Sequence, residues 1–194
     1  MAGDSNGDGI KDSVQSAVAT APFLYTSTAV SKPVGALPVF VTLVADSLAG
    51  KVDPDANSAQ VVSLSQKDAP ANLSDLVNMP LGLFAFTATV GTTGVATVGI
   101  TETFSLYVDP TTGANGYWVQ NADNVWCNLA SAAYGGKVVF EGGKLRLDFE
   151  LVDGGQFDAD GLVNGSVSNV GAPANMALSL IGYAPNATEG DFFF

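Results

Sequence analysis

The chain contains no histidine. Histidine is the commonest general base, the imidazole of most catalytic triads and a frequent ligand of zinc and copper, so its absence excludes most familiar hydrolase mechanisms. We also find no P-loop and no dinucleotide-binding glycine pattern; the stretch GTTGVATVG, residues 91–99, predicts a hairpin instead. We therefore expect no enzymatic activity. A glycosidase that uses a pair of carboxylates is the catalytic alternative that the composition leaves open.

Cysteine and basic residues are also scarce. Cys127 has no second cysteine with which to form an internal disulfide, and its apolar neighbours favour a buried, inert thiol.

Seven Lys and Arg stand against nineteen Asp and Glu, which gives a net charge of −12. Because this charge repels phosphate groups, we expect neither a nucleic-acid partner nor an anionic membrane. An acidic surface suits a medium rich in divalent cations, although solubility alone also explains it.

Long apolar runs are missing as well. No run approaches the ~20 residues that a membrane-spanning helix needs, so we expect no membrane span. The first residues, MAGDSNGDGI, have neither the basic beginning nor the apolar core of a signal peptide. Either the protein is cytoplasmic, or this is a mature piece whose leader is absent.

The residues that are abundant predict an all-β fold. The chain is 47% hydrophobic and 13% charged, with 22 glycines. It shows about eleven short apolar runs bounded by turn residues, which is typical of strands. In KLRLDFELV, residues 144–152, apolar residues alternate with Arg146, Asp148 and Glu150, which predicts an antiparallel strand with one face in water. We predict an antiparallel two-sheet β-sandwich over residues 21–194, preceded by a short N-terminal segment, residues 1–20.

That N-terminal segment contains a candidate calcium loop, DSNGDGIKDSVQ. A calcium loop of twelve positions takes its oxygens from the odd positions up to the ninth and from the last, with glycine at the sixth for the tight bend. Those ligand positions hold Asp4, Asn6, Asp8, Ile10, Asp12 and Gln15, and Gly9 stands at the bend. We predict that Ca²⁺ binds here. Because Gln15 replaces a bidentate carboxylate, we expect weak binding, with a Kd of ~10⁻⁴ to 10⁻³ M. The alternative is a solvated Asp/Gly turn without metal.

A second group of oxygen donors lies in DGGQFDADGLVNG, residues 153–165. Asp153, Asp158, Asp160 and Asn164 stand there among flexible glycines. Acids placed close together repel one another unless a cation or a basic side chain relieves them. Calcium is one explanation, and an array of Asx and Gly turns is the other.

Three aromatic residues flank the turn signal NADN in a predicted hairpin: Tyr117, Trp118 and Trp126. Aromatic faces near a loop could stack on sugar rings, and a carbohydrate-binding module with a glycan as its partner is therefore the alternative function. Packing in the core is the commoner role of such residues in a sandwich.

Two parts of the chain resemble known families. DSNGDGIKD resembles the Asp-rich calcium repeats of thrombospondin type 3 and of linkers in bacterial surface proteins, with Lys11 where those linkers often carry Pro. Residues 79–101, 116–126 and 145–165 resemble the choice-of-anchor U domain of bacterial surface and secreted proteins, with Phe157 in place of a small residue.

These resemblances imply a secreted protein located outside the cell, at the bacterial cell surface. They imply a calcium-stiffened segment ahead of a non-catalytic domain, which would act as a structural spacer, an adhesin domain or a subunit of a surface filament. The expected partners are then other copies of the chain or neighbouring domains of a surface protein.

Overall fold

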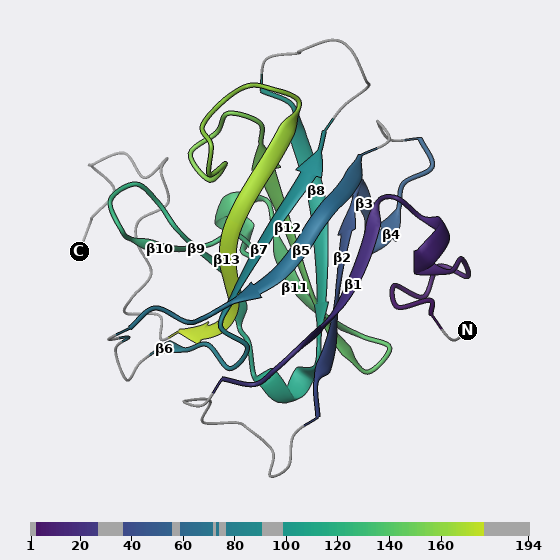
Figure 1. Ribbon diagram of the computed structural model, residues 1–194, viewed down its shortest axis with the longest axis horizontal. Helices are drawn as coiled ribbons and strands as arrows, with labels where there is room; N and C mark the ends of the chain where they lie inside the picture. The colour runs from purple at the N-terminus through teal and green to yellow at the C-terminus, as the bar shows by residue number, and fades with distance from the viewer. Residues whose placement is uncertain are drawn as a thin grey trace, which may run out of the picture.

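A computed structural model describes residues 3–26, 37–55, 59–71, 73, 77–90 and 99–176. Strands dominate this part of the chain, together with short 3-10 helices (Figure 1). The elements are η1 (Asp12–Val14), β1 (Val18–Phe23), β2 (Val39–Ala45), β3 (Ser47–Leu48), β4 (Lys51–Val52), β5 (Gln60–Lys67), β6 (Val77–Asn78), β7 (Leu83–Thr89), β8 (Thr101–Val108), η2 (Pro110–Thr112), β9 (Gly116–Gln120), β10 (Trp126–Asn128), η3 (Ala132–Tyr134), β11 (Lys137–Glu141), β12 (Lys144–Val152) and β13 (Ser166–Met176). The described residues include no helix long and apolar enough to cross a membrane.

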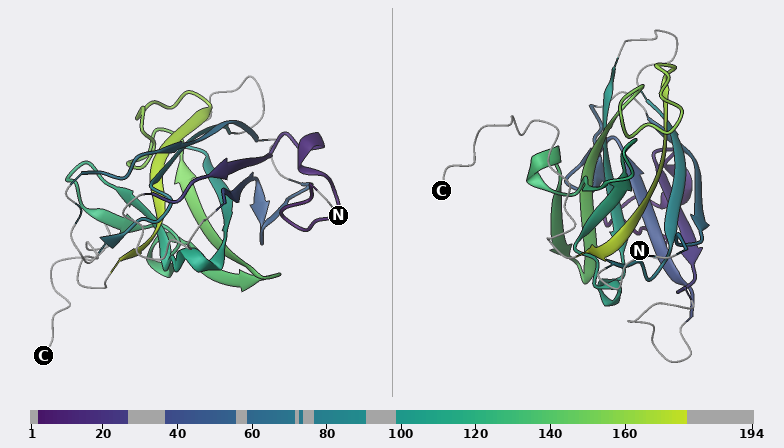
Figure 2. Two further views of the ribbon diagram at one scale, coloured as in Figure 1. Left: turned by 60° about the horizontal axis from the view of Figure 1, so that its bottom comes forward. Right: turned by 90° about the vertical axis from the view of Figure 1, so that its left-hand side faces the viewer.

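The strands form two antiparallel sheets, which confirms the predicted all-β sandwich. One sheet has the order β1-β2-β8-β12-β11, and the other has the order β10-β9-β13-β7-β5, with β6 also paired to β13. Strands β3 and β4 form a small hairpin that is not paired with either sheet. Both figures show the N-terminal segment at one side of the molecule, beside β1 and this hairpin (Figures 1 and 2). The first sandwich strand, β1, begins at Val18.

Aromatic rings fill the core between the sheets. The Phe149 ring stacks on Tyr117, with ring centroids 4.2 Å apart, and on Phe104 at 5.5 Å. Phe86 packs beside this group, 5.2 Å from Phe104. Cys127 is buried, as the sequence predicts. Because these rings come from both sheets, they hold the two layers together.

Strand β12 has the predicted bounds and the predicted alternation, with one correction. Leu147, Phe149 and Leu151 point into the core, and Glu150 is exposed on the other face. Arg146, which the alternation placed in water, is only 4% exposed. The correction shows that something covers this part of the outer sheet face.

The strand β13, with 11 residues, is the longest in the described part of the chain, although it contains Asn, Gly and Pro residues, which are depleted in strands. Pro173 stands opposite Tyr117 of β9, and the Tyr117 carbonyl accepts a hydrogen bond from Leu129 on its far side. The Pro173 nitrogen therefore faces away from β9, toward the side where the pairing with β7 ends at Gly171. A proline is tolerated in a central strand at such a place, because no ladder hydrogen bond is lost.

Residues 91–98 of the predicted hairpin lie outside the described residues.

Candidate functional site

The N-terminal loop folds as a compact turn around the Asp4 carboxylate. This carboxylate accepts hydrogen bonds from the backbone N–H groups of Gly7 (2.8 Å), Asp8 (3.1 Å) and Gly9 (3.0 Å). Gly9 has a φ of +90°, a left-handed conformation that suits glycine and that the bend of a calcium loop requires. The loop closes where the Asp12 N–H donates to the carbonyl of Gly3 at 2.7 Å.

Three of the predicted ligand side chains meet at Asp8. Its carboxylate accepts hydrogen bonds from the side-chain amides of Gln15 (2.6 Å) and Asn6 (3.1 Å) and from the Ile10 N–H (2.8 Å). Burial raises the pKa of Asp8, but these hydrogen bonds, led by that of Gln15, outweigh burial and hold the pKa below its usual value. Gln15 Oε1 is buried without a hydrogen-bond partner in the described part of the chain.

The other acidic side chains of the loop turn toward hydrogen-bond donors. Asp12 accepts from the Ser5 N–H at 2.9 Å and from the Thr20 hydroxyl at 2.7 Å. Over the residues that the structure describes, no three His, Cys, Asp or Glu side chains gather closely enough to hold a metal ion. The structure therefore brings Asn6, Asp8 and Gln15 together. The Asp4 and Asp12 carboxylates instead accept hydrogen bonds from backbone N–H groups and from the Thr20 hydroxyl.

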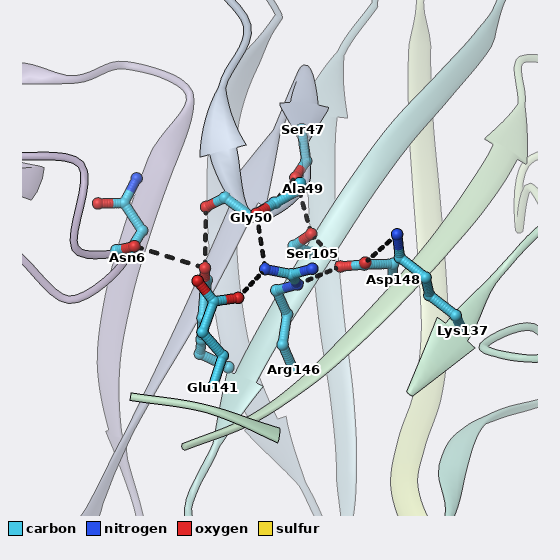
Figure 3. Close-up of polar contacts among 10 residues, drawn as sticks. Asn6, Ser47, Ala49, Gly50, Ser105, Lys137, Glu141, Arg146 and Asp148 are labelled. Atoms are coloured by element: carbon cyan, nitrogen blue, oxygen red, sulfur yellow. Dashed lines mark hydrogen bonds and ion pairs between the residues drawn. The ribbon is translucent and has the colours of Figure 1, made fainter. Parts of the chain in front are cut away.

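The loop is fastened to the outer face of the five-stranded sheet. Lys144 Nζ donates to the Ser5 carbonyl at 2.7 Å. The Tyr107 hydroxyl lies 3.4 Å from the Asn6 carbonyl and 3.1 Å from the Gly50 carbonyl. Figure 3 labels Asn6 and Gly50. Since a hydroxyl has one proton, the loop and the tip of the β3–β4 hairpin share this donor.

Arg146 is the buried cation under this hairpin. Its guanidinium donates to the Ala49 carbonyl at 2.6 Å and to the Glu141 carboxylate, and its Nε forms an ion pair with Asp148 Oδ1 at 2.9 Å (Figure 3). Burial lowers the pKa of Arg146, but Asp148 and then Tyr107 raise it, so the pKa lies above its usual value. The side chain therefore stays charged and links the hairpin to β11 and β12.

Asp148 extends the same network to β8 and β3. It accepts a hydrogen bond from the Ser105 hydroxyl at 2.5 Å, and that hydroxyl lies 2.7 Å from the Ser47 hydroxyl (Figure 3). Lys137 adds a longer ion pair at 3.8 Å. The outer face of the sheet thus carries a connected polar network, which sequence reasoning missed because its partners lie far apart along the chain.

Only glycine fits at the tip of the hairpin. Gly50 has a φ of +90°, and a Cβ atom there would overlap the Tyr107 hydroxyl and lie 2.7 Å from Arg146 Cδ. The preceding Ala49 also has a positive φ, +53°. This tight turn is what lets backbone carbonyls reach Tyr107 and Arg146 directly.

The second group of oxygen donors forms an array of turns. Asp153 is buried and accepts the N–H groups of Asn164 (3.1 Å) and Gly165 (2.9 Å). Asp158, also buried, accepts those of Gly154 and Ser168, both at 2.9 Å. The Asn164 amide donates to Asp160 at 3.0 Å. Asx-turn contacts occur at Asp160 and Asn164, which accept the N–H groups of Leu162 (2.8 Å) and Ser166 (2.9 Å). Calcium at this second group stays a prediction.

The predicted stacking residues require a correction. Tyr117 and Trp118 are fully buried, so neither ring has a face open to a sugar. The Tyr117 hydroxyl donates to Asn169 at 2.7 Å, and Trp118 Nε1 donates to Asn115 at 3.1 Å. Both rings are therefore core residues, which is the commoner role of such residues in a sandwich. Trp126 is half-buried and borders a small pocket of about 250 Å³.

A buried pair of carboxyl groups also escaped sequence reasoning. Glu102 is 3% exposed and Asp46 is buried; Glu102 Oε1 accepts the Asp46 N–H at 2.7 Å, and Asp46 accepts the Ala59 N–H at 2.6 Å. Burial, strengthened by the neighbouring Asp46 carboxyl, raises the pKa of Glu102 to about 8. The sequence contains a signal for the burial of Glu102. In TETFSLYV, Glu102 lies on the same face of the strand as Phe104 and Leu106.

Comparisons with known proteins add no relative to this picture. No protein-family model, no curated protein and no solved structure matches the chain. The resemblances to the choice-of-anchor U domain and to the thrombospondin type 3 repeat therefore stay predictions.

Proposed function

We propose that the protein is a non-catalytic, calcium-binding β-sandwich module of a bacterial extracellular or cell-surface protein. The observation that carries the calcium assignment is Gln15 Oε1, which is buried without a partner at the last ligand position of the loop. It belongs to the amide that already contacts Asp8, the central acid of the pattern. A buried oxygen that lacks a donor is costly, and a hard cation removes that cost.

The chemistry of the loop fits Ca²⁺. The six ligand positions offer carboxylate, amide and carbonyl oxygens and no nitrogen or sulfur ligand, which is the set that calcium prefers. Asp4, Asp8 and Asp12 would supply charge, Asn6 and Gln15 amide oxygens, and Ile10 its carbonyl. Asp4 and Asp12 would exchange some of their present hydrogen bonds for the ion. The ion would supply a cross-link between the two ends of the loop.

The consequence of this cross-link is mechanical. Gln15 stands three residues before β1, and its carbonyl accepts the Val18 N–H at 3.1 Å. The other end of the loop is held by Lys144 through Ser5. An ion that joins Asp4 to Gln15 would therefore fix the direction in which the N-terminal segment leaves the sheet. Such stiffening suits a structural spacer, an adhesin domain or a filament subunit that connects to other copies or neighbouring domains.

We expect calorimetry on metal-stripped protein to show weak calcium binding, with a Kd of ~10⁻⁴ to 10⁻³ M. The change Asp8→Asn should weaken it roughly tenfold or more, because it removes one of the charges that attract the ion. Asp160→Asn is the matched control. Asp160 accepts the N–H of the second following residue at 2.8 Å, as Asp8 does, but in the other group of turns.

The wild type and Asp160→Asn should give the same heats. Absence of calcium binding in the wild type would refute the proposal, and so would equal binding by the wild type and Asp8→Asn. Loss of binding in Asp160→Asn alone would place the ion in the second group of turns.

Calcium should also raise the thermal stability by a small, calculable amount. An ion that binds only the folded state contributes RT ln(1 + [L]/Kd), which is about 1.4 kcal/mol at tenfold excess over Kd. We expect a chelator to lower the Tm by a few degrees and to leave the sandwich folded, because the aromatic core between the sheets does not include the loop. Differential scanning calorimetry measures both. Complete unfolding in the chelator would contradict this view of the loop.

A further inference from the structure

A groove runs between the N-terminal loop and the outer face of the five-stranded sheet. Its volume is about 780 Å³, within the range of pockets that take small molecules. The loop supplies Ser5, Lys11 and Asp12 to its lining, and the sheet supplies Thr20, Phe40 and Lys144. Asp12 belongs both to this lining and to the candidate calcium loop, whereas Gln15, whose Oε1 is buried without a partner in the described part of the chain, is not in the lining.

Phe40 is the exposed aromatic residue of this groove. It stands on β2 opposite Pro22, and its side chain is 68% exposed, whereas Thr42 and Val44, which follow on the same face, are buried. An open aromatic ring beside hydroxyl groups offers an apolar face and polar edges together. A pyranose ring has the matching surface, because its C–H groups lie on its faces and its hydroxyls at its rim.

The groove also gathers positive charge. Two of the seven basic residues of the chain, Lys11 and Lys144, line it. In the part of the chain that the structure describes, neither lysine forms an ion pair. Lys144 is held by the Ser5 carbonyl and lies over the Tyr107 ring, 5.8 Å from its centroid. The Lys144 ammonium is therefore positioned without a carboxylate partner, which suits an anion, and the exposed Lys11 adds a second positive charge.

Asp12 is the acid in the lining, and its carboxylate is already engaged by the Ser5 N–H and the Thr20 hydroxyl. We propose that the groove binds a short anionic sugar, with the sugar ring on Phe40 and its carboxylate or sulfate between Lys11 and Lys144. The net charge of −12 repels a long polyanion, so the ligand is an oligosaccharide of a few residues or the end of a chain. This inference rests on the groove and not on calcium.

The test uses three probes and four variants of the whole chain. We expect titration calorimetry to show binding of trigalacturonate or of a sulfated trisaccharide, and at least tenfold weaker binding of neutral maltotriose. Phe40→Ala and Lys11→Gln should each weaken binding of the acidic probe at least fivefold. Phe140→Ala and Lys137→Gln are the matched controls, because Phe140 is also 68% exposed, Lys137 is 60% exposed, and both lie on β11 outside the groove.

Each result decides the proposal. Binding of either acidic probe that falls in the two groove variants and persists in the two β11 variants supports it, and the probe that binds identifies carboxylate or sulfate. The proposal is overturned if neither acidic probe binds or if maltotriose binds with the same affinity as the acidic probes. It is also overturned if Phe140→Ala weakens binding of the acidic probe as much as Phe40→Ala does. Circular dichroism confirms that each variant is folded. Repeating the titration with a chelator separates this site from the calcium proposal, since acidic-sugar binding should persist when calcium is removed.

Discussion

Between about pH 4.5 and about pH 8, we expect the free energy of unfolding to fall as the pH rises, and the change Glu102→Gln to remove most of this fall. The ordinary pKa of the Glu102 carboxyl is 4.5, and burial beside Asp46 raises it to about 8 in the folded chain. Over this window the folded protein binds a proton that the unfolded chain has released. The stabilisation from the proton is therefore complete below the lower value and is lost as the pH passes through the upper one.

The size of the effect follows from the same linkage. A pKa raised by this much corresponds to roughly 3 to 5 kcal/mol across the window, a large part of the stability of a single domain. Glutamine keeps an oxygen that accepts the Asp46 N–H and has no proton to lose. At about pH 9 the Glu102→Gln variant should therefore be more stable than the wild type, and at about pH 5 the two should be similar.

Urea denaturation at several pH values measures this difference. The matched control is Glu150→Gln, a glutamate on β12 that is exposed. We expect it to keep the pH dependence of the wild type. If Glu102→Gln and the wild type lose stability in parallel, the pair is not the source of the dependence.

The change Arg146→Met is expected to destabilise the fold by about 3 to 5 kcal/mol, because it removes one partner of a buried ion pair. Among the residues that the structure describes, Asp148 would keep only the distant Lys137 as a basic neighbour, and the Ala49 carbonyl would lose its donor. Methionine preserves much of the apolar stem, so the loss reports on the guanidinium contacts and not on a cavity.

Lys137→Met is the control, since Lys137 contacts the same Asp148 from a position that is 60% exposed, and such a pair contributes about 0 to 1 kcal/mol. The double change Arg146→Met and Asp148→Leu should recover part of the loss, because it removes the unpaired charge as well. Hydrogen exchange on Arg146→Met should show faster exchange in the β3–β4 hairpin. Equal costs for Arg146→Met and Lys137→Met would contradict this account.

The sequence alone determined the class of fold and the local shape of the loop. Period-two alternation places β12 at residues 144–152, as the structure does, because side-chain direction in a strand depends on neighbouring residues only. The bend at Gly9 follows in the same way from the conformational freedom of glycine. The meeting of Asn6 and Gln15 at Asp8 was also within reach, since these residues lie within one short loop.

Which faces are buried depends on contacts between residues that lie far apart in the chain. Arg146 alternates like an exposed residue, but the carbonyl that covers it belongs to Ala49, 97 residues earlier in the chain. Pro173 sits in a central strand because the pairing of the neighbouring β7 ends before it, which no local pattern records. Tyr117 and Trp118 face the core for the same reason, that partners distant in sequence close over them. Burial depends on long-range packing, and packing sets the pKa of Glu102, the burial of the Arg146–Asp148 ion pair and the groove beside Phe40.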